Sequence, residues 1–294
     1  MVESAPLIAA IEAGGTKFLC AVGHGPGQIL RQTEIPTTSP AETLGRVTGW
    51  FADASAEFGP CAAAGVASFG PVQLRRSRPD WGHILVTPKP GWSHTDIAGA
   101  IAHALNCPVG IDTDVNAAAI AESRLGAGQG THSLAYITVG TGVGVGLVVG
   151  GQPVHGLSHP EAGHIYPRRH TLDDFAGICP SHGDCLEGLI GGAALIARTG
   201  GHVAGLPDDD PLWDIVADYL AQLCANLVLI ASPEQIVIGG GVMRRPVLLP
   251  KIRERLAAWL NGYAPTPPVT APSLSPASGL AGAFCLGAEA ARQE

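Results

Sequence analysis

The chain has 294 residues, enough for one large domain or two modest ones, and a formal net charge of -8 at pH 7. That sign does not suit a surface that binds phosphate backbones, so nucleic acid is not an expected partner. Hydrophobic residues make up 46% of the chain and the mean hydropathy is +0.24, which excludes disorder as its overall state. The 40 glycines are about double the usual ~7% share, so many must serve turns and close backbone approaches.

No membrane-spanning helix or secretion signal is expected. The most apolar stretches, residues 134–149 and 223–238, are interrupted by glycines or by Pro233. The N-terminal sequence MVESAP has Glu3 where a signal peptide carries positive charge. Seven cysteines are an odd number, which without such a signal predicts reduced thiols and a cytoplasmic location.

The first predicted element is a β-hairpin over residues 7–22, where two apolar runs flank a glycine turn. A shift of 126 places sets a second, similar segment over it, so that Ile11 falls on Ile137 and Gly14 on Gly140. This weak repeat predicts two similar α/β lobes whose equivalent turns face each other across a cleft. Chance similarity of two glycine-rich hairpins is the alternative.

The other elements follow from apolar periodicity and from helix start and stop signals. Helices are predicted at residues 41–58, 116–125, 211–231, 250–260 and 279–291, and strands at 61–72, 107–115 and 233–242. Residues 264–276 are predicted to be a proline-rich connector, after which the last helix returns to the first lobe. The predicted domains are therefore a smaller N-terminal α/β lobe of residues 1–115 joined by residues 279–294, and a larger α/β lobe of residues 116–278.

Three glycine turns follow apolar strands: EAGGTK at 12–17, GTGVGVG at 140–146 and IGGGVM at 238–243. Such turns let backbone N–H groups approach phosphate oxygens, and the first adds a hydroxyl and a cation. Ordinary tight turns are the alternative. The spacing of a P-loop is absent, and GTGVGVG lacks the GxGxxG spacing of a dinucleotide fold.

Carboxylates stand at two places where they could contact a substrate. Asp112, Asp114 and Asn116 lie at a predicted strand–helix junction, where a carboxylate can accept a proton from a substrate hydroxyl. Helix N-capping is the alternative for this group. Glu161 and Glu187 flank a cysteine-containing loop and could bind the hydroxyl groups of a polyol, unless they are simply solvated.

The loop CPSHGDC carries Cys179, His182 and Cys185 at spacings of three and three. Two thiolates and an imidazole on a tight loop suit tetrahedral zinc, which needs one more ligand. Four nearby histidines are candidates for it: His155, His159, His164 and His170. Free thiols beside a surface histidine are the alternative. Four protein ligands would make the zinc structural, whereas three and a water would make it catalytic.

Eight motifs resemble, in this order and over nearly the whole chain, the ROK family of sugar kinases. They are EAGGTK, ASFGP, TPKPGW, DTDVN, GTGVGVG, HPEAGH, CPSHGDCLEG and IGGGV. DTDVN and the CxxHxxC loop resemble the fructokinase branch, since glucokinases of the family usually carry Asn at the position of Thr113 and a CxCGxxGC loop. Repressors of the family carry an N-terminal DNA-binding extension. The first strand here begins within ten residues, so a regulator is not expected.

The resemblance implies an α/β actin-like ATPase (ribonuclease H-like) fold, with two lobes and a central cleft that closes over ATP and Mg²⁺. It implies that Asp114 is the catalytic base, that Glu161, His164 and Glu187 surround the sugar with it, and that His164 is the fourth ligand of a structural Zn²⁺ held by Cys179, His182 and Cys185. The implied ATP-binding residues are Gly14, Gly15, Thr16, Lys17, Gly140, Thr141, Gly142, Gly239, Gly240 and Gly241.

The implied activity is ATP-dependent phosphorylation of a hexose at its primary hydroxyl, with D-fructose as the expected substrate and fructose 6-phosphate as the product. Kinases for mannose, glucose or another hexose, a non-catalytic sugar sensor and a zinc hydrolase are the alternatives. Expected partners are the sugar, the nucleotide and a second copy of the chain in a homodimer. The loop Gln73–Arg78 departs from the acidic, Asn-containing stretch usual in the family, which leaves its sugar contacts open.

Overall fold

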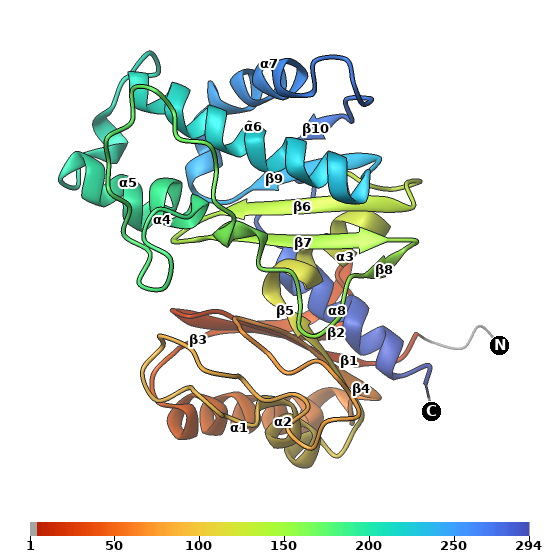
Figure 1. The fold of residues 1–294 in the computed structure, drawn as a ribbon. Helices are drawn as coiled ribbons and strands as arrows, with labels where there is room; N and C mark the ends of the chain where they lie inside the picture. The colour runs from red at the N-terminus through yellow and green to blue at the C-terminus, as the bar shows by residue number, and fades with distance from the viewer. Residues whose placement is uncertain (1–4, 294) are drawn as a thin grey trace. The chain divides into compact units, whose positions relative to one another are not determined.

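The structure is a computed structural model that describes residues 5–293, and the chain divides into two compact units. The first unit comprises residues up to 121, residues 155–159 and residues from 276 onward. The second comprises residues 122–154 and 160–275. Each unit is built around its own five-stranded sheet (Figure 1).

The sheet of the first unit has the order β3-β2-β1-β4-β5. Its strands are β1 (Ile8–Ala13), β2 (Lys17–Gly25), β3 (Gln28–Pro36), β4 (Ala63–Ser68) and β5 (Val109–Thr113). The first three strands are antiparallel neighbours, whereas β4 and β5 continue parallel to β1. All of β4 and β5 and nearly all of β1 are buried, as expected for parallel strands covered on both faces.

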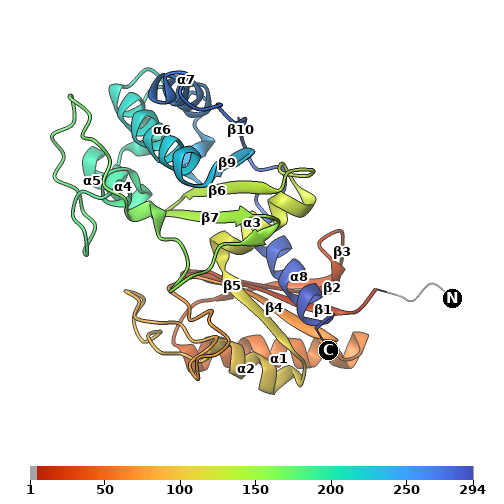
Figure 2. The ribbon, with the colours of Figure 1, turned by 45° about the vertical axis from the view of Figure 1, so that its right-hand side comes forward.

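Helices cover both faces of this sheet (Figures 1 and 2). One face carries α1 (Pro40–Phe58), which Ser39 caps, and α2 (Ile97–Leu105), which Asp96 caps. The other face carries α8 (Ser278–Ala290), a helix rich in small residues. A Cβ atom at Gly65 or Gly110 would collide with the backbone of α8, so these glycines let the last helix lie directly on the sheet.

The sheet of the second unit has the order β10-β9-β6-β7-β8. Its strands are β6 (Ser133–Val139), β7 (Val143–Val149), β8 (Gln152–Pro153), β9 (Gln235–Gly239) and β10 (Val269–Thr270). Here β6, β7 and β8 are antiparallel neighbours, and β9 and β10 continue parallel to β6. Each strand therefore has a counterpart in the first sheet with the same neighbours and direction, which agrees with the predicted repeat.

The core of the second unit contains α6 (Pro211–Ala231), with α7 (Leu248–Leu260) packed beside it. Among the described residues α6 alone is long and apolar enough to cross a membrane, but 72% of its most apolar window is buried inside the fold. Short helices fill the rest: α4 (Leu186–Ile190), α5 (Gly192–Thr199) and the 3₁₀ turns η1 (Ala162–His164), η2 (Val203–Gly205) and η3 (Val242–Arg244). Because most of its apolar surface is buried, α6 is a core helix of the second unit.

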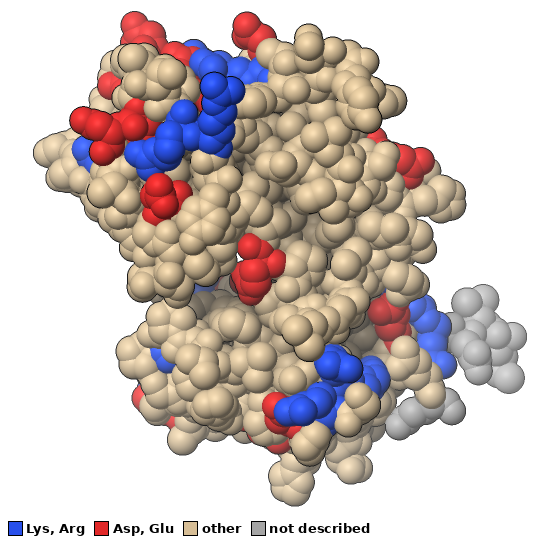
Figure 3. Space-filling view, viewed as in Figure 1, with Lys and Arg blue, Asp and Glu red and all other residues tan. Residues whose placement is uncertain are grey.

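Helix α3 (Asp114–Leu125) begins directly after β5, two residues earlier than its predicted start. The predicted connector 264–276 contains the short edge strand β10, which was not expected there. The sequence predictions also did not include β3, β8, α2, α4 or α5. Charged side chains are sparse on the face shown in Figure 3, and most of its Lys and Arg side chains lie near Asp or Glu.

Candidate active site

The turn Gly14–Thr16 joins β1 to β2, and all three of its carbonyl groups accept hydrogen bonds from within the first unit. Thr37 donates its hydroxyl to Gly14 at 2.7 Å and its backbone N–H to Thr16 at 2.9 Å, and the Lys89 ammonium donates to Gly15. In the described chain no protein acceptor takes the N–H groups of Gly15 and Thr16. Two adjacent N–H donors on an exposed turn suit an anion.

The turn Gly140–Gly142, between β6 and β7, repeats this pattern in the second unit. Its carbonyl groups accept hydrogen bonds from the N–H groups of Gly192 at 2.8 Å, Ala193 at 3.1 Å and Gly140 itself at 2.9 Å. Across residues 5–293 no protein acceptor takes the N–H groups of Thr141 and Gly142. The 126-residue shift sets Gly15 and Thr16 on these two positions, so the repeat extends to the hydrogen bonding of the turns.

The third predicted turn, Gly239–Gly241, follows β9 in the second unit. Gly240 has φ +98°, and a Cβ atom there would collide with the Val139 backbone. Only glycine is therefore unstrained at this position. The space around Gly241 is open, and η3 begins at the next residue.

Asp114 is the first residue of α3, at the carboxyl end of β5, as predicted for a strand–helix junction. Its Oδ1 accepts the N–H of Val115 at 2.8 Å. Thr113, not Asp114, caps the helix, because its hydroxyl accepts the N–H of Asn116 at 3.2 Å. The carboxylate of Asp114 is thus placed at the edge of the sheet where ligands commonly bind in α/β folds.

Glu12, near the end of β1, is a residue to which the sequence analysis gave no role. Its Oε2 is buried and has no hydrogen-bond partner among the described residues. Burial, with the charge of Asp114 second, raises the pKa of Glu12 to about 7, while the Leu280 N–H and Lys17 act in the opposite direction. The only sequence signal was its place in EAGGTK, because burial of a single strand residue is visible only in the fold.

Asp112 has a structural role at the same corner of the first unit. Its Oδ1 accepts hydrogen bonds from the Thr113 N–H and the Asn116 side-chain amide, both at 2.8 Å. Its Oδ2 lies 2.8 Å from Nε2 of His155, and this hydrogen bond raises the pKa of His155 although burial opposes it. All of its strong partners are internal, so Asp112 fixes the β5–α3 junction.

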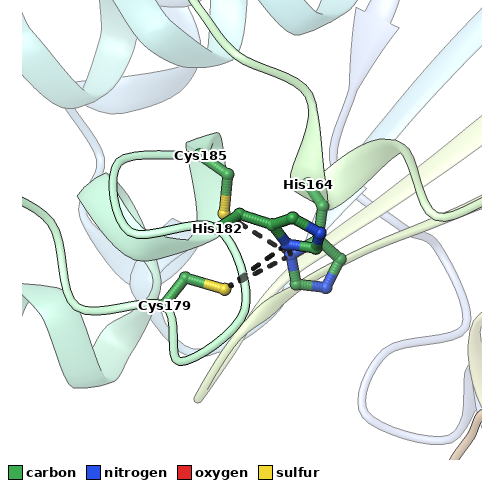
Figure 4. Close-up of side chains that lie close together, drawn as sticks. All are labelled: His164, Cys179, His182 and Cys185. Atoms are coloured by element: carbon green, nitrogen blue, oxygen red, sulfur yellow. Dashed lines mark hydrogen bonds between the residues drawn. The ribbon is translucent and has the colours of Figure 1, made fainter.

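Four side chains of the second unit converge in one cluster, His164, Cys179, His182 and Cys185 (Figure 4). The Nδ1 atoms of His164 and His182 are 3.3 Å apart, and both lie 3.7 Å from the Cys179 sulfur. The Cys185 sulfur is 3.4 Å from Nδ1 of His164. All four candidate ligand atoms lie within 4.8 Å of one another.

The four separations of 3.3–3.7 Å fit one tetrahedral zinc ion, and the remaining pairs, at up to 4.8 Å, would need only a small inward shift of the side chains. With Zn–N near 2.0–2.1 Å and Zn–S near 2.3 Å, a tetrahedron places its donor atoms roughly 3.3–3.8 Å apart. Two thiolates and two imidazoles are also a common donor set for structural zinc. The other three histidines weighed as the fourth ligand have different partners: His155 bonds Asp112, His159 accepts the Val72 N–H and His170 accepts the Leu172 N–H.

The His164 imidazole presents its second nitrogen to Glu187, with Nε2 4.0 Å from Oε1. The Oε2 of Glu187 accepts the Val143 N–H at 2.9 Å, directly after the second glycine turn. A Cβ atom at Gly163 would collide with the carbonyl group of Val143, so η1 packs against the same strand. Glu161 precedes η1, is exposed and accepts the His164 N–H through its carbonyl group at 3.0 Å.

The predicted site residues are thus divided between the units. Asp114 and the turn Gly14–Thr16 belong to the first unit, together with Glu12. The second unit contains the other two glycine turns, the predicted sugar-binding residues Glu161, His164 and Glu187, and the cluster of two cysteines and two histidines. Lys17 was predicted to bind phosphate, but its ammonium forms a 2.6 Å ion pair with Glu34 on β3.

The unusual loop Gln73–Arg78 is tied to its own surroundings. Gln73 exchanges two backbone hydrogen bonds with Gly82 and His83, and Arg78 pairs with Asp80 at 3.1 Å. The Arg76 guanidinium lies over the Trp81 ring, 4.9 Å from its centre. Two of the three arginines in the loop, Arg76 and Arg78, thus have contacts with neighbouring residues of the same segment.

Several known proteins are similar to this chain over nearly its whole length. A fructokinase from Pediococcus pentosaceus is 43% identical over 284 residues, which cover 95% of this chain and 97% of that protein. A ROK hexokinase structure from Thermus thermophilus superposes with a TM-score of 0.82 at 28% identity, covering 98% of this chain and 100% of that one. A ROK glucokinase from Streptomyces griseus, solved with glucose and AMPPNP, superposes with a TM-score of 0.76 at 26% identity, covering 98% and 100%.

These likenesses extend over both units. The fold is α/β, and the solved neighbours are sugar kinases of the actin-like ATPase class, as predicted. A match to the ROK family covers residues 8–290. The chain therefore belongs to the ROK family.

Proposed function

We propose that this protein is a fructokinase, which transfers the γ-phosphoryl group of ATP to the primary hydroxyl of D-fructose and yields fructose 6-phosphate and ADP. The observation that carries this proposal is the paired turn geometry, in which Gly14–Thr16 and Gly140–Gly142 each offer two adjacent N–H groups without protein acceptors. The 43% identity to a fructokinase supports the choice of sugar. An assay for ADP release that depends on the presence of fructose tests the proposed activity.

ATP is the proposed phosphoryl donor. The Streptomyces griseus relative was solved with AMPPNP, an ATP analogue, and with glucose. We assign the phosphate groups to the N–H donors of the turns Gly14–Thr16 and Gly140–Gly142, and the adenosine side to Gly239–Gly241, where the space around Gly241 is open. Backbone donors fixed in this way stabilise phosphoryl charge without reorganising.

Asp114 is the proposed base. Its carboxylate would take the proton of the sugar hydroxyl as the resulting oxygen bonds to the γ-phosphorus, and the bond from that phosphorus to the bridging oxygen of ADP breaks. Asp114 is suited to this role because it lies at the end of a buried strand and the start of a helix. Asp112, two residues before it, is committed to His155 and Asn116 and is not available.

Mg²⁺ is the proposed metal partner of ATP, and when bound it would neutralise part of the phosphate charge. Glu12 fits as the residue that holds it, directly or through water. Its Oε2 is buried without a hydrogen-bond partner in the described chain, and a carboxylate oxygen is the ligand type that Mg²⁺ prefers. Mg²⁺ bound at Glu12 would also offset the negative charge of the nearby Asp114.

Glu161, His164 and Glu187 are proposed to bind the hydroxyl groups of the sugar, with Zn²⁺ holding them in place. His164 would ligate zinc through Nδ1, which leaves Nε2 to face Glu187 and the sugar. Four protein ligands close the coordination sphere, so the zinc would be structural. A zinc hydrolase needs an open position and is therefore disfavoured.

We also propose that the protein acts in the cytoplasm and as a homodimer. None of the seven cysteines, which all lie within the described residues, forms a disulfide, as expected in a reducing compartment. Sedimentation velocity tests the dimer. A sensor without activity is disfavoured because the base candidate Asp114 and both glycine turns are retained.

A further inference from the structure

The segment TPKPGW holds Lys89 beside the first glycine turn. Trp92 is fully buried, and its ring centre lies 5.5 Å from that of Phe18 on β2. Its indole N–H also donates to the backbone of the first unit at 2.8 Å. Pro88 and Pro90 restrict the backbone on both sides of Lys89. The ammonium is therefore presented by an anchored segment, which distinguishes it from a freely rotating surface lysine.

The ammonium of Lys89 donates a short hydrogen bond to the carbonyl group of Gly15. Within residues 5–293 it has no carboxylate within ion-pair distance. An ammonium carries three N–H donors and one positive charge, so donors and charge remain for an anion. The N–H groups of Gly15 and Thr16, which also lack protein acceptors, lie on the same turn.

Lys17, the cation within the EAGGTK motif, is placed differently. Its ammonium is 2.6 Å from the Glu34 carboxylate, which lies one strand away on β3. To bind a phosphate group it would have to give up this ion pair. Its charge is already compensated on the sheet, whereas that of Lys89 is not.

We propose that Lys89, rather than Lys17, is the cation that binds the phosphate groups of the nucleotide at the Gly14–Thr16 turn. This rests on the proposed kinase function for the identity of the anion, a nucleoside di- or triphosphate. Lys89 and the two free N–H groups of the turn then form one anion site, in which charge-assisted and backbone hydrogen bonds act on the same phosphoryl oxygens.

The test compares the full-length variants Lys89→Met, Lys89→Arg and Lys17→Met. Calorimetric titrations with Mg-AMPPNP, Mg-ADP and adenosine measure the affinity of each. Lys89→Met is expected to weaken AMPPNP binding by about tenfold or more and to reduce its dependence on salt, because a charged contact is lost. Adenosine binding should stay within about twofold, Lys89→Arg should recover most of the loss, and Lys17→Met should stay within about threefold.

Wild-type AMPPNP affinity in Lys89→Met, or an equal loss in Lys17→Met, would overturn the proposal. So would an equal loss of adenosine binding, since that would mark Lys89 as a purely structural clamp. Failure of the proposed function has a different signature. A wild-type protein that binds AMPPNP through Lys89 but releases no ADP with any hexose retains the anion site and loses the kinase assignment.

Discussion

Glu187 lies 4.0 Å from Nε2 of His164, while Nδ1 of the same imidazole faces the two cysteines and His182. One histidine thus connects the proposed zinc cluster to a carboxylate that also accepts the Val143 N–H beside the second glycine turn. This arrangement explains how His164 could ligate zinc and contact a sugar, because each role uses a different nitrogen.

Glu187→Gln should lower kcat/KM for the sugar by about tenfold to a hundredfold, the worth of a hydrogen bond to a charged group. The amide oxygen of Gln can still accept the Val143 N–H, so the turn and the zinc content should persist. Glu254→Gln, on an exposed position of α7, is the matched control and should leave kcat/KM unchanged. Steady-state kinetics on both variants provide the measurement, and an unaltered Glu187→Gln enzyme with full zinc would remove Glu187 from the sugar site.

Asp114→Asn should lower kcat by about 10²- to 10⁴-fold, the usual contribution of a general base. Nucleotide affinity should change little, because the phosphate contacts are assigned to other residues. Asp53→Asn, exposed on α1, is the control. Single-turnover rates and AMPPNP titrations separate chemistry from binding. Near-native turnover in a folded Asp114→Asn protein would show that another group accepts the proton.

Cys179→Ser should lose zinc and lower Tm by several degrees, because metal binding and folding of the 179–185 loop are coupled. Each kcal/mol of stability corresponds to about 2–4 °C in a chain of this size. Cys224→Ala changes a thiol buried in the core of the second unit and should keep its zinc. Elemental analysis of protein purified without chelators, together with melting curves, checks both. Wild-type protein without zinc would contradict the assignment.

Asp173→Asn should destabilise the protein by about 3 kcal/mol or more, because it leaves a buried guanidinium without its partner. Asp173 forms 2.7 and 2.8 Å bonds with Arg198 and a 2.7 Å bond with the Tyr219 hydroxyl. Burial alone would raise the pKa of Asp173, but the hydrogen bonds from Arg198 and Tyr219 outweigh it and lower the pKa to about 2.

The pKa of Asp173 is lower in the folded chain than its ordinary value of 3.8. The stabilisation that the ionised carboxylate gives to the folded state is therefore complete above about pH 4 and is lost as the pH falls towards 2. Denaturant unfolding at several pH values measures the free energy of unfolding of the wild-type protein and of Asp173→Asn. The difference between the two free energies should be constant from pH 7 to 5 and should become smaller below pH 4. Asp208→Asn is the control, because Asp208 is half-exposed in its 3.3 Å pair with Arg245 and should cost only about 0–1 kcal/mol. An equal loss of unfolding free energy in Asp173→Asn and Asp208→Asn would contradict the stabilising role assigned to the buried Asp173.

Elements with strong local signals could be predicted from the sequence. The capped helix α1 and the long apolar helix α6 have clear periodicity and start signals. The strand β10 has only two residues inside a proline-rich segment, so no local pattern distinguishes it, and its pairing with β9 arises from the fold. Edge strand β3 is mostly exposed and buries only Ile35, so its sequence has no clear apolar alternation.

Motif and chemistry together singled out Asp114 and the loop residues Cys179, His182 and Cys185, whereas the choice of His164 as their partner came from the family resemblance; the structure brings these four side chains of the cluster together. Glu12 and Lys89 were not predictable, because their significance depends on burial or on a neighbour far along the chain. Glu12 becomes notable only when its Oε2 is enclosed, and Lys89 only when it meets a turn 74 residues earlier. The partners of Lys17 and His155 could not be assigned for the same reason.

The most direct test of the proposed function is kcat/KM for fructose, mannose, glucose and N-acetylmannosamine with saturating Mg-ATP, read as sugar-dependent ADP release. Thr113 offers no amide to a sugar hydroxyl, and its own hydroxyl accepts the Asn116 N–H. Two unmatched hydroxyl groups at about 1–3 kcal/mol each would favour fructose over glucose by roughly 30-fold to 10⁴-fold. Fructose as the preferred substrate is the predicted result, and glucose turned over as well as or better than fructose would contradict it.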